Sequence, residues 1–478
     1  MNSINYYDFF FLSPEIIFVL AGLVLLFLRR QKYLCFLLII GGTGLSMVLN
    51  ILMFNVNKDI IYNTMEVSDL SVLLRVIILA GTLIFIISTK EFAFNLEYTN
   101  MYYAFLSFAS LGMIILPSAK DLLTIFIAFE LTSISTYALP FIDQKSENRF
   151  EAGIKYFLTG AFSSGLILFG MSYVFGMTGT LNLSEIAVNI APYQGSPILY
   201  LAFMLMLAGF SYKMALAPFH LWAPDTYSGS PSPVSGYLAG ITKKGPFVAA
   251  FKIFLVGFAA IKLEQSFALG FLAILTMTTG NLAALVQKNV KRMIAFSSVA
   301  NAGTILVGFS VGNLYGLSGA IIHIAGHLVM TVGAFMVIWY IEETRDNSEI
   351  DSFAGLNKSN PLLAISMVVF MMSLGGIPPL LGFWSKIVII LGAVDAGGLY
   401  FFLAVALILN SALSLVYYFR VIKYMYMKEP LVPENIKDVP FAFGKVGIGL
   451  SAALIIVSGL VPGKFVQIVI NAVEIFIG

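Results

Sequence analysis

Long apolar runs recur along almost the whole chain, and they restrict its fold more than any other feature. About fourteen such stretches alternate with polar or Pro/Gly-rich breaks, and a helix needs roughly 20 apolar residues to cross the hydrocarbon core of a bilayer. The runs centre near residues 21, 43, 80, 109, 131, 163, 212, 246, 277, 302, 328, 378, 412 and 453. They predict an all-α polytopic membrane protein with about 14 transmembrane helices. The short piece at 464–477 is expected to be a partial turn or an interfacial segment.

The composition agrees with a bilayer as the solvent of this chain. Of its 478 residues, 59% are hydrophobic and 11% are charged, whereas an average soluble domain has about 25% charged residues. No stretch between the runs is long enough to fold as a separate domain. The N-terminal sequence MNSINYYDFFFLSPEIIF lacks the basic leader of a cleaved signal peptide, so the first span is expected to remain as a helix.

Lysines and arginines are distributed unequally between alternate loops. The loops after odd-numbered spans hold Arg29, Arg30, Lys32, Lys90, Lys145, Arg149, Lys155, Lys288, Lys291, Arg292, Arg345, Lys358, Arg420, Lys423, Lys428, Lys437 and Lys445, and the opposite loops and the C-terminal tail hold Lys58, Lys120, Lys262 and Lys464. Because positive charge accumulates on the cytoplasmic side, this ratio of 17 to 4 predicts that both termini lie on the non-cytoplasmic side of the cell (inner) membrane.

Sequence motifs for cofactors, metals and nucleotides are absent. The single cysteine, Cys35, excludes an internal disulfide and cannot supply the roughly four thiolates of an iron–sulfur cluster. The sequence contains no GxGxxG after a strand, no Walker motif, no CxxC and no HExxH. We therefore expect no cofactor and no metal in this chain, and the net charge of +2 gives no reason to expect a nucleic-acid partner.

Two spans are interrupted by proline in comparable ways. The seventh places Lys213 before Pro218, and the twelfth, GGIPPLLGFWSK, places Pro378 and Pro379 before Lys386. Proline frees a backbone carbonyl, and irregular backbone is tolerated at membrane depth only beside protein or water. Paired broken helices in two halves of a transporter indicate inverted repeats around a midplane site.

This pairing predicts a division of the chain into four parts. Residues 1–100 would form helices 1–3, residues 101–262 a first five-helix repeat (helices 4–8), and residues 263–427 a second (helices 9–13). Residues 428–478 would hold a loop and helix 14. IAFE at 127–130 and IAFS at 294–297 fall at matching places in the two repeats.

Glu130 and Lys213 are the first candidate functional pair. A charge at the bilayer centre costs about 2.5–3.5 kcal/mol on insertion scales, so it persists only where it is paired, hydrated or useful. Glu130 is the only acidic residue at the centre of a span, and Lys213 is its natural partner. The pair can function in proton transfer, or it can be an interhelical ion pair that only orders the helix bundle.

Further buried lysines suggest a row that passes protons. Burial in a protein or membrane generally lowers the pKa of a lysine side chain. Lys243 and Lys386 lie at membrane depth, as Lys213 does. Lys244 points about 100° away from Lys243 on a helix, so only one of the two is expected to line the path. Lys252 is expected to extend towards the surface.

The three histidines have different expected roles. His323 and His327 lie one helical turn apart, and two histidines on one face of one helix cannot ligate opposite sides of a haem. Histidine titrates near neutrality, so His327 is a candidate proton carrier, or it is a neutral histidine that bonds between helices. His220 follows Pro218 and is expected to be structural or mixed in role.

Two blocks of the sequence resemble a known family. KMALAPFHLWAPDTYSGSPSPVSGYLAGITKK and PLLAISMVVFMMSLGGIPPLLGFWSK are similar to the antiporter-like membrane subunits of respiratory complex I, and the resemblance extends over residues 70–427. It implies two inverted five-helix repeats, broken seventh and twelfth helices and a hydrophilic axis within the membrane. It also implies sister subunits of the L and M types, and small membrane subunits of the K, J, A and H types, as partners.

The resemblance assigns roles to particular residues. Glu130 corresponds to the essential glutamate of the fifth helix, Lys213 to its paired lysine, Lys243 to the connecting lysine and Lys386 to the terminal lysine. Lys243 and Lys386 favour the N type over the L and M types, and the short C-terminal tail is expected to lack the lateral helix of the L type. Thr331 departs from the family, in which many relatives have a lysine.

The function implied is a proton-translocating subunit of a complex I-like NADH (or reduced deazaflavin):quinone or phenazine oxidoreductase. Its proton pathway would run through Glu130, Lys213, Lys243, His327 and Lys386. Flavin, iron–sulfur clusters and the quinone or phenazine are expected in partner subunits. Two alternatives remain: a cation/proton antiporter subunit of the Mrp or membrane-bound hydrogenase type, and a non-conducting assembly subunit.

Overall fold

The computed structural model describes residues 6–143, 147–429 and 439–477, so Lys145 and Lys437 of the loop comparison lie outside it. The α-helices are α1 (Tyr6–Phe11), α2 (Ser13–Phe27), α3 (Lys32–Ile51), α4 (Asp69–Ser88), α5 (Lys90–Asn95), α6 (Thr99–Ile115), α7 (Leu122–Tyr137), α8 (Glu147–Thr178), α9 (Leu183–Asn189), α10 (Pro197–Lys213), α11 (Trp222–Gly229), α12 (Ser232–Tyr237), α13 (Lys244–Lys252), α14 (Lys262–Leu285), α15 (Val290–Val311), α16 (Leu314–Arg345), α17 (Leu356–Ser359), α18 (Pro361–Gly375), α19 (Leu381–Ala396), α20 (Tyr400–Met427), α21 (Ala442–Leu460) and α22 (Pro462–Ile477). Two π-helical segments, η4 (Leu238–Thr242) and η5 (Ile253–Gly257), flank α13. The 3₁₀ turns are η1 (Leu116–Ser118), η2 (Leu139–Phe141), η3 (Ala191–Tyr193), η6 (Ala259–Ile261) and η7 (Ile350–Phe353), and strands β1 (Lys58–Ile60) and β2 (Met65–Val67) form one antiparallel hairpin.

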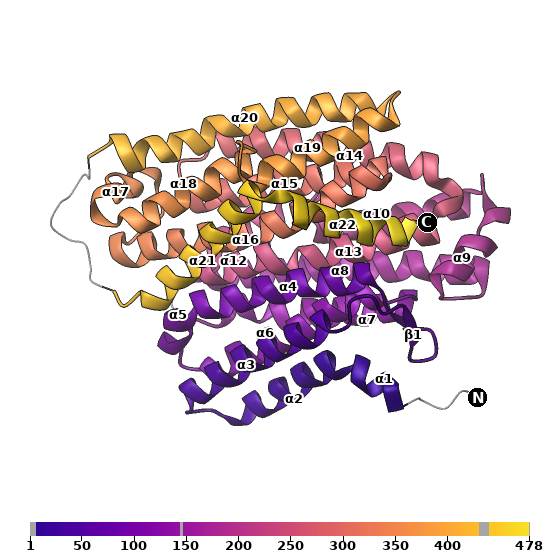
Figure 1. Ribbon diagram of the computed structural model, residues 1–478, viewed down its shortest axis with the longest axis horizontal. Helices are drawn as coiled ribbons and strands as arrows, with labels where there is room; N and C mark the ends of the chain where they lie inside the picture. Colours follow the sequence, from indigo (N-terminus) through magenta and orange to yellow (C-terminus); the bar gives the residue numbers. More distant parts are fainter. Residues whose placement is uncertain (1–5, 144–146, 430–438, 478) are drawn as a thin grey trace.

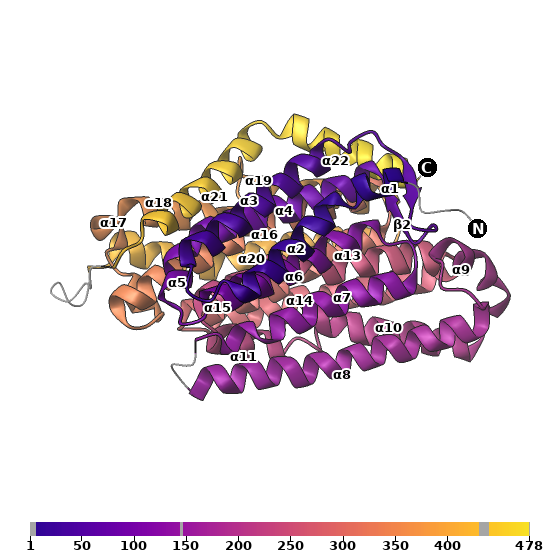
Figure 2. The same cartoon turned by 90° about the horizontal axis from the view of Figure 1, so that it is seen from below.

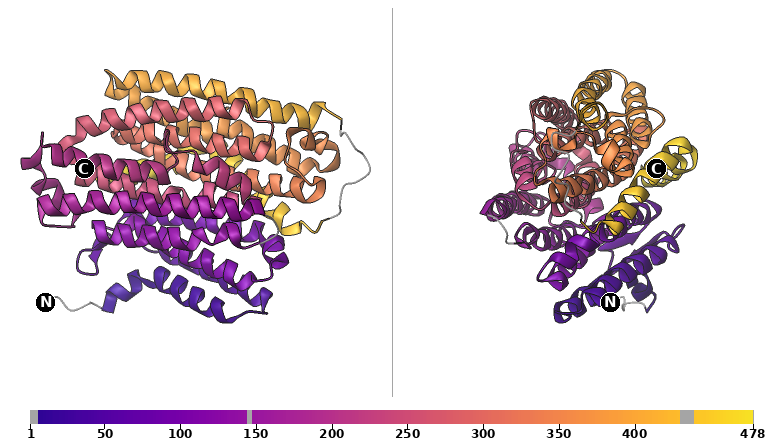
Figure 3. Two further views of the ribbon diagram at one scale, coloured as in Figure 1. Left: turned by 180° about the vertical axis from the view of Figure 1, so that it is seen from behind. Right: turned by 90° about the vertical axis from the view of Figure 1, so that its left-hand side faces the viewer.

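The long helices lie side by side along one direction (Figures 1 and 2). Ten helical stretches in the described part of the chain are long and apolar enough to cross a membrane, and α2, α10 and α18 are shorter apolar helices. The prediction of an all-α polytopic membrane protein is confirmed. The N-terminal helices α2 and α3 occupy one edge of the bundle and α20 the opposite edge (Figures 1 and 3).

Helices α15 and α16 form the centre of the bundle. Helix α15 is buried at every position except Arg292, α16 is buried over most of its length, and α15 packs between α14 and α16. Figure 1 shows α16 and α15 between α4 on one side and α20 on the other. The outer helices instead expose large apolar side chains such as Leu37, Phe162 and Leu409, because lipid can solvate them.

Polar side chains fix where the central helices begin and end. Asp121 Oδ1 accepts a hydrogen bond from Thr124 N and caps α7, and Asn289 Oδ1 accepts one from Arg292 N and caps α15. Such caps satisfy backbone donors that have no partner in the first turn of a helix. Gly312, at φ +65°, ends α15.

The three prolines of the sequence pattern, Pro218, Pro378 and Pro379, lie at helix breaks, as predicted. Helix α10 ends at Lys213, and residues 214–221 turn before α11 begins. Helix α18 ends at Gly375, and residues 376–380 turn before α19. Gly376 has φ +86°, and a Cβ there would lie 2.9 Å from Lys386 Cδ, so this turn depends on glycine.

The last part of the chain differs from its prediction. Residues 464–477 were expected to form a partial turn or an interfacial segment; the partial turn is wrong, because they belong to α22, a helix of 16 residues that packs against α16 and α4. Val469, Ala472 and Val473 are buried at helical spacing. Pro462 stands at the first position of α22, where its missing N–H has no intrahelical partner to lose.

Candidate functional site

Glu130 and Lys213 meet inside the bundle, although hydroxyl groups mediate much of their contact. Lys213 Nζ lies 3.9 Å from Glu130 Oε1, and it donates to Ser133 Oγ at 2.9 Å and to Tyr137 OH at 2.8 Å. Glu130 also accepts a hydrogen bond of 2.5 Å from Ser164 Oγ on α8. The ammonium group therefore has three oxygen partners at a place where water is scarce.

A small cavity of about 30 Å³ separates Lys213 from Lys243. Its lining includes the hydroxyl side chains of Ser133, Thr136 and Thr242. One buried water molecule needs about 10–15 Å³ of free space and two to four polar partners. The cavity therefore has room for about two water molecules between the two lysines.

Lys243 and Lys244 both point into the bundle, towards different helices. Lys243 Nζ donates to Ser298 O at 2.9 Å and Ser298 Oγ at 3.2 Å, on α15. Lys244 Nζ lies 2.7 Å from His327 Nδ1, on α16. Both lysines are buried, so the 100° between neighbouring side chains does not turn either one towards lipid.

The two histidines of α16 continue the row towards Lys386. His323 and His327 are buried, with ring centroids 6.1 Å apart. His323 Nδ1 lies 2.9 Å from Ser385 Oγ, and its Nε2 lies 3.1 Å from Asn301 Oδ1. Because Asn301 Nδ2 donates to Ser297 O, its Oδ1 accepts, and His323 Nε2 carries a proton.

Lys386 lies beside the second helix break. Its Nζ donates to the carbonyls of Leu374 at 2.9 Å and Gly375 at 3.1 Å, which are at the end of α18, where carbonyls lack helical partners. A cavity of about 10 Å³ beside Lys386 is lined by Asn301, Asn410 and other polar residues. Lys386 thus has freed carbonyls on one side and a polar cavity on the other.

The joint between α21 and α22 lies against this break. Trp384 Nε1 donates to Gly459 O at 2.8 Å. A Cβ on Gly459 would lie 2.3 Å from Pro379 O and 2.7 Å from Leu380 Cα. Only glycine allows this approach of two backbones, and the contact holds the 376–380 turn in place.

Gly459→Ala should therefore shift this turn and lower proton transfer at Lys386. The added methyl meets backbone that cannot rotate away, and such overpacking destabilises by about 1–3 kcal/mol. Gly449→Ala on the same helix is the matched control, since nothing lies within 4 Å of its Cβ. Thermal unfolding and proton translocation of the two variants would be compared. Equal behaviour of the two variants would show that the joint does not hold the turn.

Lys252 lies apart from this row, whereas His220 interacts electrostatically with Lys243. The expectation that Lys252 extends to the surface is wrong: it is buried, and its Nζ donates to Glu66 Oε1, Pro117 O and Ala119 O at 2.7–2.9 Å. The partners come from β2, η1 and the residue that follows η1, because the hairpin folds over the end of α6. His220 is half-buried in the first break, beside exposed Phe219.

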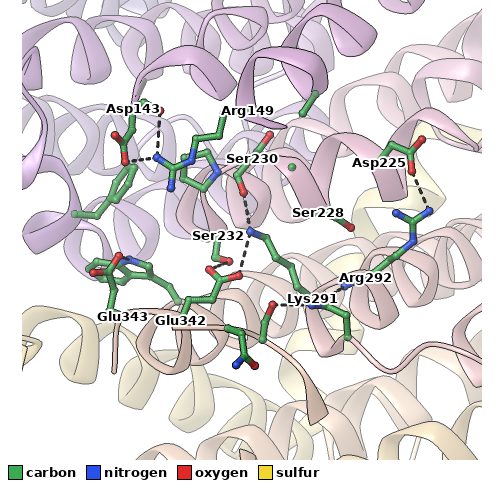
Figure 4. A pocket seen from close by; sticks show the side chains of 18 of the residues that line it. Asp143, Arg149, Asp225, Ser228, Ser230, Ser232, Lys291, Arg292, Glu342 and Glu343 are labelled. Carbon is green, nitrogen blue, oxygen red and sulfur yellow. Dashed lines mark hydrogen bonds and ion pairs between the residues drawn. The ribbon is translucent and has the colours of Figure 1, made fainter. Parts of the chain in front are cut away.

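A larger polar cavity lies where α8 and α15 begin and α16 ends, and Figure 4 shows its lining side chains. It has a volume of about 630 Å³. Lys291 Nζ donates to Ser230 O at 2.7 Å and lies 3.2 Å from Glu342 Oε1, and Arg292 Nη2 lies 2.9 Å from Asp225 Oδ1. We call this cavity the polar mouth. Helix α11 contributes to both cavities, since Asp225 lines the polar mouth, and Trp222 and Tyr227 line the small cavity beside Lys213.

The structure brings all five predicted site residues into one polar row, and it adds members that the sequence prediction did not assign. The additions are Ser164, Lys244, Ser298, Asn301, His323 and Ser385. One signal was available in the segment FSSVANAGT of α15, which places Ser297, Asn301 and Thr304 at helical spacing in an apolar helix. No group of three or more metal-ligating side chains occurs among the described residues.

Comparisons with known proteins identify the class. The family model for transmembrane proteins of NADH:quinone oxidoreductase and Mrp antiporter matches residues 119–414, and the chain belongs to this family. F(420)H(2) dehydrogenase subunit N of Methanosarcina mazei is 39% identical over 98% of this chain and 99% of its own length. NADH-quinone oxidoreductase subunit N of Trichlorobacter lovleyi is 36% identical over 97% and 96%. A chain of respiratory complex I from Thermus thermophilus matches with a TM-score of 0.79 and 28% identity over 95% of this chain and 98% of its own. Within its family, this chain is therefore a subunit of the N type.

Proposed function

We propose that this chain moves protons across its membrane as the N-type subunit of a complex I-like oxidoreductase. The supporting observation is one row of buried and half-buried ionisable groups from Glu130 to Lys386. Lys213 contacts Glu130, a cavity with room for water joins it to Lys243, and Lys244 contacts His327. Groups that share hydrogen bonds or water can pass a proton without crossing hydrocarbon.

In the proposed mechanism, partner subunits supply the energy and this chain supplies the path. Redox reactions in the partners change the electrostatics at Glu130 and Lys213. A proton then leaves Lys213 through the small cavity to Lys243, continues to His327 and reaches Lys386. Each charge moved works against about 2.3 kcal/mol per 100 mV, and a change of about two pKa units is worth about 2.7 kcal/mol, so changes of this size are sufficient.

The polar mouth suits proton uptake from the cytoplasmic side. Its lining includes Arg149, Lys155, Lys291 and Arg292, which belong to the loops rich in lysine and arginine. Helix α11 separates it from the cavity beside Lys213, so a proton held at Asp225 is one helix away from the relay.

The proposed topology has fourteen passages. The interrupted pairs α10–α11, α12–α13 and α18–α19 each count as one passage, together with α2, α3, α4, α6, α7, α8, α14, α15, α16, α20 and α21. Helices 4–8 (residues 101–262) and 9–13 (residues 263–427) would form the two inverted repeats, between residues 1–100 and 428–478. Helix α1 and the end of α22 lie towards the same end of the bundle (Figure 1), which supports placing both termini on the non-cytoplasmic side.

The relatives' names indicate the kind of complex, and the family resemblance indicates the partner subunits. The relatives are subunits of NADH-quinone oxidoreductase and of F(420)H(2) dehydrogenase, so this chain would assemble with sister L and M types and with small K, J, A and H types in the cell (inner) membrane. Flavin, iron–sulfur clusters and the quinone or phenazine would reside in partners, and this chain would perform no redox step.

Proton movement by the intact complex tests the proposal against cation antiport. Inside-out vesicles supplied with NADH, or with reduced deazaflavin, should acidify internally, and a protonophore should dissipate the gradient. Replacing sodium by potassium should leave the initial rate unchanged. Acidification that requires sodium would favour the Mrp-type antiporter, and donor oxidation without proton movement would contradict the proposal.

A further inference from the structure

Lys244 is a buried lysine whose partner is a titratable group. Lys244 is 1% exposed, and its Nζ lies 2.7 Å from His327 Nδ1. Lys243, one position earlier, instead donates to a serine hydroxyl and a backbone carbonyl, neither of which accepts a proton at ordinary pH. Of these two lysines, Lys244 therefore makes the direct contact with a proton acceptor of the row.

The backbone before the two lysines explains why both reach the interior. The π-helical segment η4 ends at Thr242, and π-helical turns are frequent at functional sites. Gly240 allows η4 to approach α16, since a Cβ there would lie 2.9 Å from Val332 Cγ2 and 3.2 Å from Leu328 O. With α16 this close, the 100° between successive side chains directs one lysine to α15 and the next to α16.

Charge in this region is unbalanced. In the part of the chain that the structure describes, no carboxylate oxygen lies within 4 Å of the ammonium nitrogens of Lys243, Lys244 or Lys386. Adjacent like charges in a low-dielectric interior cannot all ionise together. Such a cluster is stabilised when protons are shared among its members, and a lysine–histidine contact of 2.7 Å is the geometry for sharing one.

We propose that Lys244 is the lysine that exchanges the proton with His327. In the transfer step an N–H bond of the Lys244 ammonium breaks, the proton bonds to Nδ1 of neutral His327, and a neutral amine remains. Lys243 and the water-sized cavity behind it then restore the proton on Lys244. The inference rests on the proposed function, and it assigns the connecting step to two lysines instead of one.

Arginine separates proton exchange from simple charge at this position. Lys244→Arg keeps a positive charge and hydrogen-bond donors, but arginine does not release its proton in proteins. Lys244→Gln removes the charge, and Lys244→His restores a titratable group. Lys252→Arg, two turns along, is the matched control, because the contacts of Lys252 are with Glu66 and backbone carbonyls outside the row.

The measurement is the number of protons moved per electron in vesicles, with assembly checked on native gels. We expect Lys244→Arg and Lys244→Gln to slow translocation through this subunit by about 100-fold, the low end for a positioned acid–base group. Lys244→His should recover part of it, and Lys252→Arg should translocate normally. If an arginine variant does not assemble, the glutamine and histidine variants decide alone.

The contrary outcomes are distinct from failure of the proposed function. Normal translocation by Lys244→Arg or Lys244→Gln, with loss in Lys213→Ala, would show that Lys244 only joins helices and would overturn this inference. Normal translocation by Lys213→Ala as well would contradict the proposed function, because no part of the relay would then be required.

Discussion

Replacing Lys213 by alanine should abolish proton translocation through this subunit while the complex remains assembled. The ammonium group is the link between Glu130 and the cavity that leads to Lys243. Without it the nearest proton-carrying group of the row is beyond the cavity. A positioned acid–base group contributes about 10²–10⁴-fold to a proton-transfer rate, so we expect a fall of about 100-fold or more.

Glu130→Ala, which removes the acidic partner of Lys213, should likewise abolish proton translocation while the complex remains assembled. The side chain of Glu130 is 21% exposed and that of Lys213 is 6% exposed. Loss of the Glu130 carboxylate therefore leaves the Lys213 ammonium group in the interior with hydroxyl partners only. Lys213 would then favour its neutral form and could not load a proton from the cytoplasmic side. Glu130→Gln, which keeps the Ser164 contact but not the charge, should resemble Glu130→Ala.

The experiment compares donor oxidation, proton translocation and assembly in the same vesicles. Lys358→Ala is the matched control, because Lys358 is 67% exposed in side-chain terms and far from the row. Oxidation should continue in all variants, and translocation should fail only in the two pair variants. Full translocation by both the Lys213 and the Glu130 variants would contradict the proposed mechanism. Loss of assembly would favour a scaffold role for the pair.

Membrane burial explains why the main site residues could be predicted from sequence. In hydrocarbon an unpaired charge is so unfavourable that Glu130, Lys213 and Lys386 are conspicuous in apolar runs, and the proline breaks are visible in the same way. The structure places the first two in contact and Lys386 beside the second break. Their roles in proton transfer remain predictions.

Side-chain direction could not be read from the sequence. Whether Lys243 or Lys244 reaches His327 depends on the rotation of one helix about its axis, and that rotation is set by the approach of Gly240 to α16 and by the π-helical turn before the lysines. The burial of Lys252 depends in turn on a hairpin that folds over it. Both features arise from packing between segments far apart in the chain.

Helix α22 was missed for a related reason. Its sequence is amphipathic, and only the position of α16 and α4 shows what covers its apolar face. Length alone indicated a partial turn or an interfacial segment. The extent of this helix, and its joint with α21 against the second break, followed from packing and not from hydropathy.

Replacing Arg75 by methionine should instead destabilise the fold. Arg75 is fully buried on α4 and its Nη2 lies 2.7 Å from Glu15 Oε1 on α2, while its Nη1 reaches Asn50 Oδ1 on α3. The pair thus joins three helices. Arg75 Nε and Glu15 Oε2 have no hydrogen-bond partner in the described residues, so each charge is balanced chiefly by the other.

Removal of one member of such a pair leaves a buried charge without compensation, which destabilises by about 3–5 kcal/mol. We expect Arg75→Met to lower the thermal unfolding temperature and the amount of assembled complex. The double variant Glu15→Leu with Arg75→Met should recover most of the loss, because replacing a whole buried pair with apolar groups is often neutral. A single variant as stable as the parent would show that the pair contributes little.

The two ion pairs together separate a conducting role from an assembly role. Arg75 pairs with Glu15 and reaches Asn50, and no chain of hydrogen bonds among the described residues joins these three side chains to the row, although α4 packs against α16. Their variants should lose assembly and translocation in proportion, with protons per electron unchanged in the complex that remains. The Glu130 and Lys213 variants should lose protons per electron at full assembly. If both pairs behaved like Glu15 and Arg75, buried charge in this protein would serve only to specify helix packing.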